Sequence, residues 1–134
     1  MKLSVSKEKK KTWVVFSKYI RMRDAKLTTD TLTKAKCVSC QKVYPIKNLQ
    51  AGHFVSRTHT SVLFDEQNVH AQCVGCNMFK QGNFAGYLEE MRRLYGETVI
   101  DRILSTRFDI KRFKASELVE MREEYKQKIK EMEA

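Results

Sequence analysis

The chain has 134 residues, with 26 lysines and arginines against 16 aspartates and glutamates, and a net charge of +10. That length suits one ordinary domain, and we interpret residues 1–134 as a single domain. No apolar run approaches the roughly 20 residues of a membrane span, and the start shows no secretory signal. We therefore expect a cytoplasmic protein with no membrane partner.

The first predicted element is a basic amphipathic helix over residues 10–27. Its apolar side chains recur at near-helical spacing: Trp13, Phe16, Ile20 and Leu27. Residues 1–36 hold eleven basic side chains and three acidic ones. This balance favours a nucleic-acid partner, although a solvated basic surface also explains it. The DNA contacts expected here are Lys9, Lys10, Lys11, Lys18, Arg21 and Arg23.

Residues 28–36 are polar and predict a loop. The segment that follows contains four cysteines. They form two CxxC pairs: Cys37 with Cys40, and Cys73 with Cys76. Two thiolates three residues apart can point at one ion, and two such pairs complete a tetrahedron around zinc. A pair of redox motifs is the alternative, but no βαβ pattern surrounds either one. The spacing predicts one structural zinc per chain.

An α+β fold is predicted by the remaining pattern. Residues 49–55 and 68–72 favour two strands joined by a polar, basic loop. A helix is expected to begin at Asn77, to be interrupted at Gly82-Asn83 and to resume over 84–95. Residues 97–104 predict another short helix.

The last predicted helix belongs to a helical tail over residues 97–134, and we expect Ser116 to cap it. Its apolar residues form one stripe: Leu118, Met121, Tyr125, Ile129 and Met132. Such a stripe packs either in the core or against a partner helix. We favour a partner helix, which makes a homodimer through this helix a hypothesis.

Among the three histidines, His53 has the most informative setting. It lies near the end of a predicted strand, inside the loop that the zinc would close. Asn68 and Asn77 follow, the latter directly after the second cysteine pair. If 68–72 is a strand, Asn68, His70 and Gln72 share one of its faces.

The motifs CVSC, AGHFVSR and FDEQNVHAQCVGCNMFKQGN together resemble the HNH, or ββα-metal, nucleases. More narrowly, they resemble the phage NinG/Rap recombination endonucleases, which act on branched DNA. The specific part covers residues 37–87, and a weaker similarity reaches the last helix. The resemblance implies a zinc-stapled HNH core over 37–95, flanked by the basic helix and the carboxy-terminal helices. It also implies a phage protein that cuts Holliday junctions or other recombination intermediates inside the bacterial host cell.

The resemblance assigns roles to individual residues. His53 matches the general base, Asn68 the residue that braces the loop bearing the base, and Asn77 a ligand of the catalytic Mg²⁺ or Mn²⁺. Lys80 and Arg57 are placed to contact phosphate. Histidine can accept a proton at neutral pH, whereas a zinc ion with four sulfur ligands has no open position for catalysis.

Gly52 departs from the family pattern, because many HNH enzymes carry an aspartate there as a second metal ligand. His70 is one candidate replacement and is therefore assigned to the active site. Other candidates are Gln50, Asp65 and Glu66, and Asn77 alone is a further option. The departure keeps open a zinc-dependent DNA- or junction-binding protein without catalysis. A third reading is an RNA-binding protein of the translation machinery.

Overall fold

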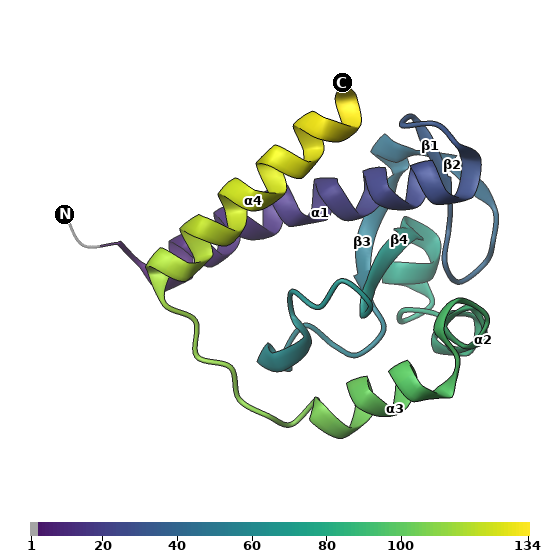
Figure 1. Cartoon of the computed structure of the whole chain (residues 1–134). Helices are drawn as coiled ribbons and strands as arrows, with labels where there is room; N and C mark the ends of the chain where they lie inside the picture. Colours follow the sequence, from purple (N-terminus) through teal and green to yellow (C-terminus); the bar gives the residue numbers. More distant parts are fainter. Residues whose placement is uncertain (1–2) are drawn as a thin grey trace.

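The computed structural model describes residues 3–134, and its architecture is α+β, as the sequence predicts (Figure 1). Helices α1 (Val5–Thr29) and α4 (Ala115–Glu133) lie side by side along one side of the strands. Helices α2 (Phe84–Tyr95) and α3 (Glu97–Thr106) cover the other side. No helix among the described residues is long and apolar enough to cross a membrane.

Helix α1 extends beyond the predicted range at both ends. Ser4 caps it by accepting a hydrogen bond from the Lys7 N–H, and Asp30 ends it in a left-handed conformation with φ of 55°. Phe16 and Ile20 are fully buried, as expected, but Leu27 is 75% exposed. The buried face of the helix therefore stops earlier than the apolar pattern indicates.

Strand β1 (Lys34–Lys36) pairs antiparallel with β2 (Val43–Pro45). The expectation of a loop over 28–36 is thus wrong at both ends, where α1 and β1 replace it. A three-residue strand of Lys-Ala-Lys has no pattern of its own, so its pairing with β2 defines it. The first cysteine pair lies in the turn between these strands.

Strand β3 (Leu49–His53) pairs antiparallel with β4 (Val69–Cys73), and Gly52 stands opposite His70. Both strands lie within one or two residues of their predicted ends. A short 3₁₀ turn, Ile46–Asn48, leads into β3. A second 3₁₀ turn, Thr60–Val62, lies in the loop that joins the two strands.

The segment after β4 forms the π-helical turn η3 (Gly75–Phe79) where a helix was predicted to begin. Left-handed residues Gln81 and Asn83 then separate this turn from α2. Helix α2 has the predicted bounds. Helix α4 begins at Ala115, one residue before the predicted cap Ser116.

The apolar stripe of α4 packs within the chain against α1. Leu118 is fully buried, and its carbonyl accepts a hydrogen bond of 2.8 Å from the Thr12 hydroxyl. The Tyr125 ring meets the Phe16 ring edge to face, with 5.0 Å between centroids. Because α1 covers this stripe, the stripe does not supply the free surface that the homodimer hypothesis required.

Three buried clusters surround the strands. One joins α1, the β3–β4 sheet and α4: Phe16, Ile20, Ala51, Val69 and Tyr125. A second joins the loop after β3 to α2 and α3: Val38, Phe54, Val55, Val62, Tyr87, Met91, Ile100 and Ile103. A third surrounds the cysteines: Ala25, Ala35, Cys37, Leu49, Ala71, Cys73 and Cys76.

Candidate metal centre and active site

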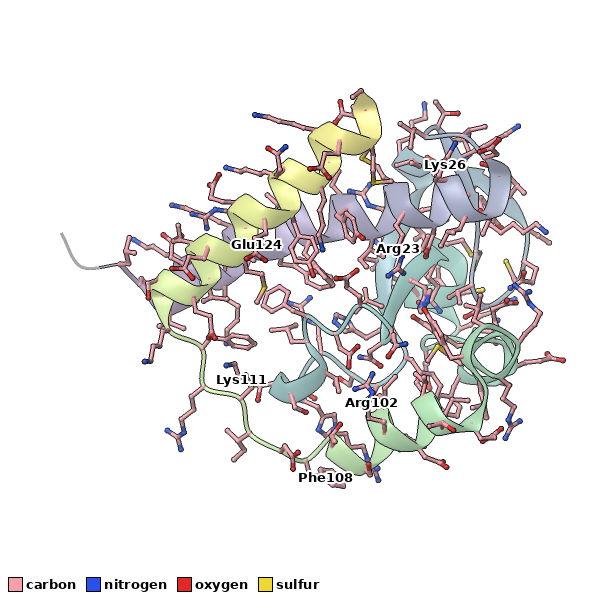
Figure 2. The ribbon with its side chains drawn as sticks, in the orientation of Figure 1. Arg23, Lys26, Arg102, Phe108, Lys111 and Glu124 are labelled. Carbon is pink, nitrogen blue, oxygen red and sulfur yellow. The ribbon has the colours of Figure 1, made fainter. Side chains whose placement is uncertain are left out.

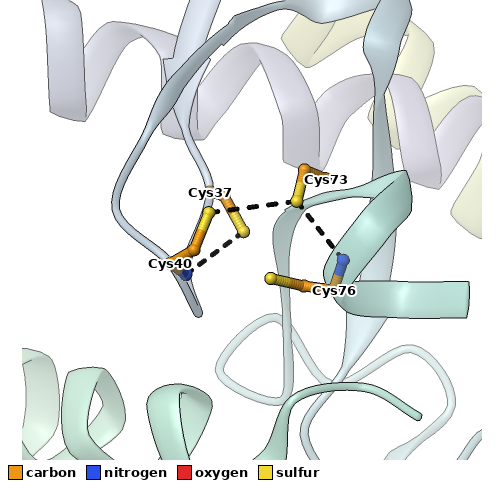
Figure 3. Close-up of side chains that lie close together, drawn as sticks. All are labelled: Cys37, Cys40, Cys73 and Cys76. Atoms are coloured by element: carbon orange, nitrogen blue, oxygen red, sulfur yellow. Dashed lines mark hydrogen bonds between the residues drawn. The ribbon is translucent and has the colours of Figure 1, made fainter. Parts of the chain in front are cut away.

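The four cysteine side chains converge between the β1–β2 turn and the end of β4 (Figure 3). Their sulfur atoms all lie within 4.8 Å of one another, and none forms a disulfide. Tetrahedral zinc with bonds of about 2.3 Å separates its sulfur ligands by about 3.8 Å. The Sγ atoms of Cys40 and Cys73 are 3.9 Å apart. The cluster could therefore hold a zinc ion, as the spacing predicts.

Backbone and amide donors surround these sulfurs. The Cys40 N–H points to Cys37 Sγ at 3.5 Å, and the Cys76 N–H points to Cys73 Sγ at 3.4 Å (Figure 3). Asn83 Nδ2 donates to Cys76 Sγ at 3.3 Å. Burial raises the pKa of Cys37 to about 12. At Cys73 burial acts the same way, but donors including the Cys76 N–H outweigh it and lower the pKa to about 7.

A cavity of about 690 Å³ opens beside β3. Helix α1, strand β3, the loop after it and the turn η3 line it, so four segments meet there. Its polar lining residues are Ser17, Arg21, Gln50, His53, Ser56, Arg57, Asn77 and Gln81. The structure thus brings together the two residues predicted for base and metal ligand, with two of the predicted phosphate contacts. Within the described part of the chain, no acidic side chain lines this cavity.

His53 is fixed on both sides in this cavity. Its ring stacks on Trp13, with 4.9 Å between centroids and 19° between planes. Its Nε2 lies 3.0 Å from the Leu63 carbonyl oxygen. A carbonyl can only accept, so Nε2 carries the proton and Nδ1 of the neutral ring keeps a free lone pair. Burial lowers the pKa of His53, and Arg57 adds to this against the opposing effect of the Leu63 bond.

Asn77 and Gln50 form a second pair at the cavity wall. Asn77 Nδ2 donates a 2.6 Å hydrogen bond to Gln50 Oε1. Among residues 3–134, no protein group donates to Asn77 Oδ1. This amide oxygen is therefore available to a hard cation, which prefers oxygen ligands.

Asn68 joins the two ends of the loop that follows His53. Its Oδ1 accepts the Val55 N–H at 2.8 Å, and its Nδ2 donates to the Val55 and Val62 carbonyls at 2.9 and 3.1 Å. The side chain is fully buried, so these bonds act in a dry environment. The contacts suit the bracing role expected for Asn68.

His70 lies away from the cavity, in the packing between β4 and α2. Its Nδ1 is 3.2 Å from the Tyr87 hydroxyl, which itself donates to the Gly52 carbonyl at 2.7 Å. The Nδ1–H therefore donates to Tyr87, while Nε2 accepts from the Tyr95 hydroxyl at 2.7 Å. Every polar atom of the ring is used by the fold. The structure does not bring His70 to Asn77, as a replacement metal ligand would require.

The other proposed substitutes for an acid at position 52 are also bound elsewhere. Asp65 pairs with Arg102 at 2.8 Å, and Glu66 accepts the Tyr125 hydroxyl at 3.0 Å. Only Gln50 lines the cavity.

Arg23 is not on the basic face where the sequence placed it. It points from α1 into the molecule (Figure 2), where Nε pairs with Asp24 at 2.9 Å. Its terminal nitrogens donate to the Glu66 and Val69 carbonyls, both at 2.8 Å. With its donors engaged, Arg23 is a structural residue in this arrangement.

The remaining predicted phosphate contacts lie outside this cavity. Lys9, Lys10 and Lys11 stand near the amino end of α1, where Lys11 is 3.7 Å from Glu8. Lys18 lies 3.9 Å from Glu133, and Lys80 is exposed just after η3.

The family model described as "Bacteriophage Lambda NinG protein" matches residues 2–134. This chain belongs to the NinG family. The protein ninG of Escherichia phage lambda is 32% identical over 115 residues, and that of Salmonella phage P22 is 33% identical over 117. Each match covers 85% of this chain and 52% of the relative. The chain thus spans about half the length of these relatives. No solved structure matches it.

Trp13 and Ser17 of this NinG-family chain line the cavity, although the sequence did not mark them as site residues. The sequence placed Trp13 only on the buried face of α1. Trp13, Ser17 and Arg21 recur every four residues, so they share one stripe of the helix. That spacing was the available signal, but it does not tell which element the stripe faces.

Proposed function

We propose that this NinG-family chain is a metal-dependent endonuclease of the HNH type, which hydrolyses phosphodiester bonds in branched DNA. One observation carries the proposal: His53 on β3 and Asn77 on η3 line the same cavity. In this proposal β3, β4 and the helical segment after them form the ββα-metal core. A zinc ion held by the four cysteines would be structural, because four sulfur ligands leave no open position.

Hydrolysis of a phosphodiester requires a group that takes a proton from the attacking water. His53 suits this step because Leu63 fixes the proton on Nε2, which leaves Nδ1 as the base. The pKa of His53 is lowered by burial, so the neutral, basic form prevails at pH 7. Stacking on Trp13 restricts rotation of the ring and so holds Nδ1 in one direction.

The Asn77 Oδ1 is the oxygen that we propose holds Mg²⁺ or Mn²⁺. A divalent ion held there would supply positive charge for the phosphate and for the leaving 3′ oxygen. Gln50 orients Asn77 by accepting its Nδ2–H. A cavity without a carboxylate is compatible with Mg²⁺, because this ion keeps several waters and takes further oxygens from substrate phosphates.

Arg21 and Arg57 supply positive charge at the cavity. Arg57 is on the loop that follows His53, and its guanidinium lies 5.9 Å from the Trp13 ring centroid. We propose that both side chains bind phosphates next to the scissile bond, since guanidinium groups form paired hydrogen bonds with phosphate oxygens.

A zinc-dependent DNA- or junction-binding protein without catalysis is the second candidate. The observation that favours it is the lack of an acidic side chain among the described cavity residues, together with glycine at position 52. Such a protein would use Arg21 and Arg57 for binding, and His53 only for packing against Trp13.

Cleavage assays separate the two candidates. Pure protein is incubated with labelled four-way junction, flap and linear duplex DNA, in Mg²⁺, in Mn²⁺ and in EDTA, and its zinc content is measured afterwards. We expect branched DNA to be cut with either ion and not in EDTA, while zinc stays bound. Binding without cleavage under every condition would support the second candidate. Equal cutting of linear and branched DNA would contradict the proposed substrate class.

The Asn77→Asp and Asn77→Ala variants test the metal ligand itself. Aspartate keeps an oxygen at this position, so the Mg²⁺ concentration that the Asn77→Asp variant needs for half-maximal rate should stay close to that of the parent. Alanine removes the oxygen and should raise the ion concentration needed for half-maximal rate by at least tenfold. An unchanged metal requirement in Asn77→Ala would exclude Asn77 as a ligand.

A further inference from the structure

The segment between α3 and α4, residues 107–114, is an irregular connection that we call the strap (Figure 1). Its charged residues are four bases, Arg107, Lys111, Arg112 and Lys114, and one acid, Asp109. Two large apolar side chains are exposed between them, Phe108 by 70% and Ile110 by 77%. Phe108 lies at the outer edge of the molecule (Figure 2). Folding therefore does not account for this combination of residues.

The strap is anchored to the loop that joins β3 to β4. The Lys111 N–H donates to Thr60 Oγ1 at 2.9 Å. Ser61 Oγ donates to the carbonyl of Thr106, the last residue of α3 before the strap, at 2.8 Å. The Phe113 ring packs edge-on against Phe64, with 5.5 Å between centroids. The same loop carries Arg57 at the cavity, so one loop connects the strap with the candidate active site.

The strap also meets the amino end of α1, which lies about a hundred residues earlier in the sequence. Lys9 Nζ is 5.6 Å from the centre of the Phe113 ring, and Lys111 Nζ is 5.5 Å from it. Two basic segments thus converge on one aromatic ring. Glu117 lies 3.0 Å from Lys111 Nζ and neutralises part of this charge. The positive charge that remains costs free energy to gather at one place, and an anionic partner would offset that cost.

We propose that the strap and Lys9 form a second DNA-binding surface, which holds the phosphate backbone of a segment outside the cavity. The inference rests on the proposed function only in taking DNA as the ligand. Lysine and arginine neutralise phosphates, while exposed aromatic and aliphatic side chains contact sugars and bases. The Arg107 guanidinium lies 4.4 Å from the centroid of the Phe108 ring, so this exposed ring stands beside a positive charge.

Salt-dependent binding tests this surface. A fluorescent four-way junction is titrated without added divalent ion, at several salt concentrations. The strap variant is Lys111→Gln, Arg112→Gln and Lys114→Gln combined. Its affinity near 0.1 M salt should fall by at least tenfold, and its log–log salt slope should be shallower by about two to three, since each lost phosphate contact accounts for about 0.9.

The matched control removes the same charge from β1 and its turn: Lys34→Gln, Lys36→Gln and Lys42→Gln, three exposed lysines at the zinc end. Its slope should stay within about half a unit of the parental value, less than the change for one phosphate contact. Equal losses in both triple variants would mean that only net charge matters, which overturns the proposal. An unchanged slope in the strap variant also overturns it and points to a protein partner.

The Phe108→Ala, Ile110→Ala double variant tests the apolar part. Because both side chains are exposed, its melting temperature should equal that of the parent, while junction affinity should fall several-fold with an unchanged slope. If the double variant binds the junction as tightly as the parent, these two residues do not belong to the DNA-binding surface. A parent that binds but never cuts contradicts the proposed nuclease and leaves this inference standing. A parent that cuts, with strap variants that bind normally, contradicts the inference alone.

Discussion

Gly52 and Gln72 are packed so closely that a side chain at position 52 would overlap Oε1 of Gln72. An added Cβ would also lie 2.9 Å from the Gln72 Cδ. Gln72 is fully buried and held by donation to Ser39 Oγ at 2.9 Å and to the Gly82 carbonyl at 2.6 Å. It cannot move aside without losing those bonds. The glycine at position 52, where many HNH nucleases have an aspartate, thus has a packing cause.

Gly52→Ala is expected to lower the free energy of unfolding by about 1–3 kcal/mol, the usual effect of overpacking a core. Adding Gln72→Ala should recover part of this loss, because the overlapping side chain is gone. Gly75→Ala is the control, since its Cβ would meet only Cys73 Sγ at 3.9 Å. Denaturant unfolding checks the series, and a Gly52→Ala protein as stable as the parent would contradict it.

Zinc removal is expected to unfold the region around the β strands. Structural zinc contributes on the order of 10 kcal/mol, and the cysteine cluster includes buried residues of β4 and the β1–β2 turn. Metal analysis should give one zinc per chain, and Cys73→Ser should lose both the metal and the cooperative melting transition. A metal-free parent, or a Cys73→Ser variant that melts normally, would refute this prediction.

Arg21 and Arg23 are two residues apart on α1 but should respond differently to substitution. Arg21→Gln should weaken DNA binding and flatten its salt slope by about 0.9, with little change in melting. Arg23→Gln should cost about 3–5 kcal/mol of stability, because it leaves the Asp24 carboxylate buried without a cation, with only the Ala71 N–H as a partner. Melting temperature and DNA affinity are measured for both variants. Equal changes in the two variants would contradict the buried placement of Arg23.

Acid should destabilise the fold through His70. Burial lowers its pKa to about 4, below the unfolded value near 6.5. The unfolded chain then binds more protons, so this contribution is complete above pH 6.5 and is lost as the pH falls toward 4. Across that window the loss reaches about 3 kcal/mol. Unfolding free energies of the parent and of His70→Gln at pH 7, 6, 5 and 4 test this. Equal pH dependence in the two proteins would contradict it.

The parts of the fold that the sequence predicted are those set by local pattern. Residues 84–95 carry helical periodicity and end at a glycine, and α2 has these bounds. The CxxC spacing predicts the sulfur cluster because a tetrahedral ion imposes its own geometry. His53 and Asn77 were placed together by family resemblance, and the cavity brings them to one site.

The parts that escaped prediction depend on tertiary partners. The sequence pattern of α1 does not distinguish a basic residue that faces solvent, like Lys18, from one that donates to the Glu66 and Val69 carbonyls, like Arg23. The apolar pattern of α4 likewise does not indicate whether the helix that packs against it belongs to the same chain. His70 is polar on a predicted strand, and only the two tyrosines of α2 reveal that its ring is part of the core.

The role of His53 as the general base is tested most directly by single-turnover cleavage of a four-way junction by His53→Ala. Its folding, zinc content and junction affinity are measured in parallel. The control is His59→Ala, because His59 is on the β3–β4 loop but is not among the residues that line the cavity. We expect His53→Ala to lose about two to four orders of magnitude in rate, with affinity within a few-fold of the parent and His59→Ala cutting normally. A folded, zinc-loaded His53→Ala protein that cuts at the parental rate would contradict the account.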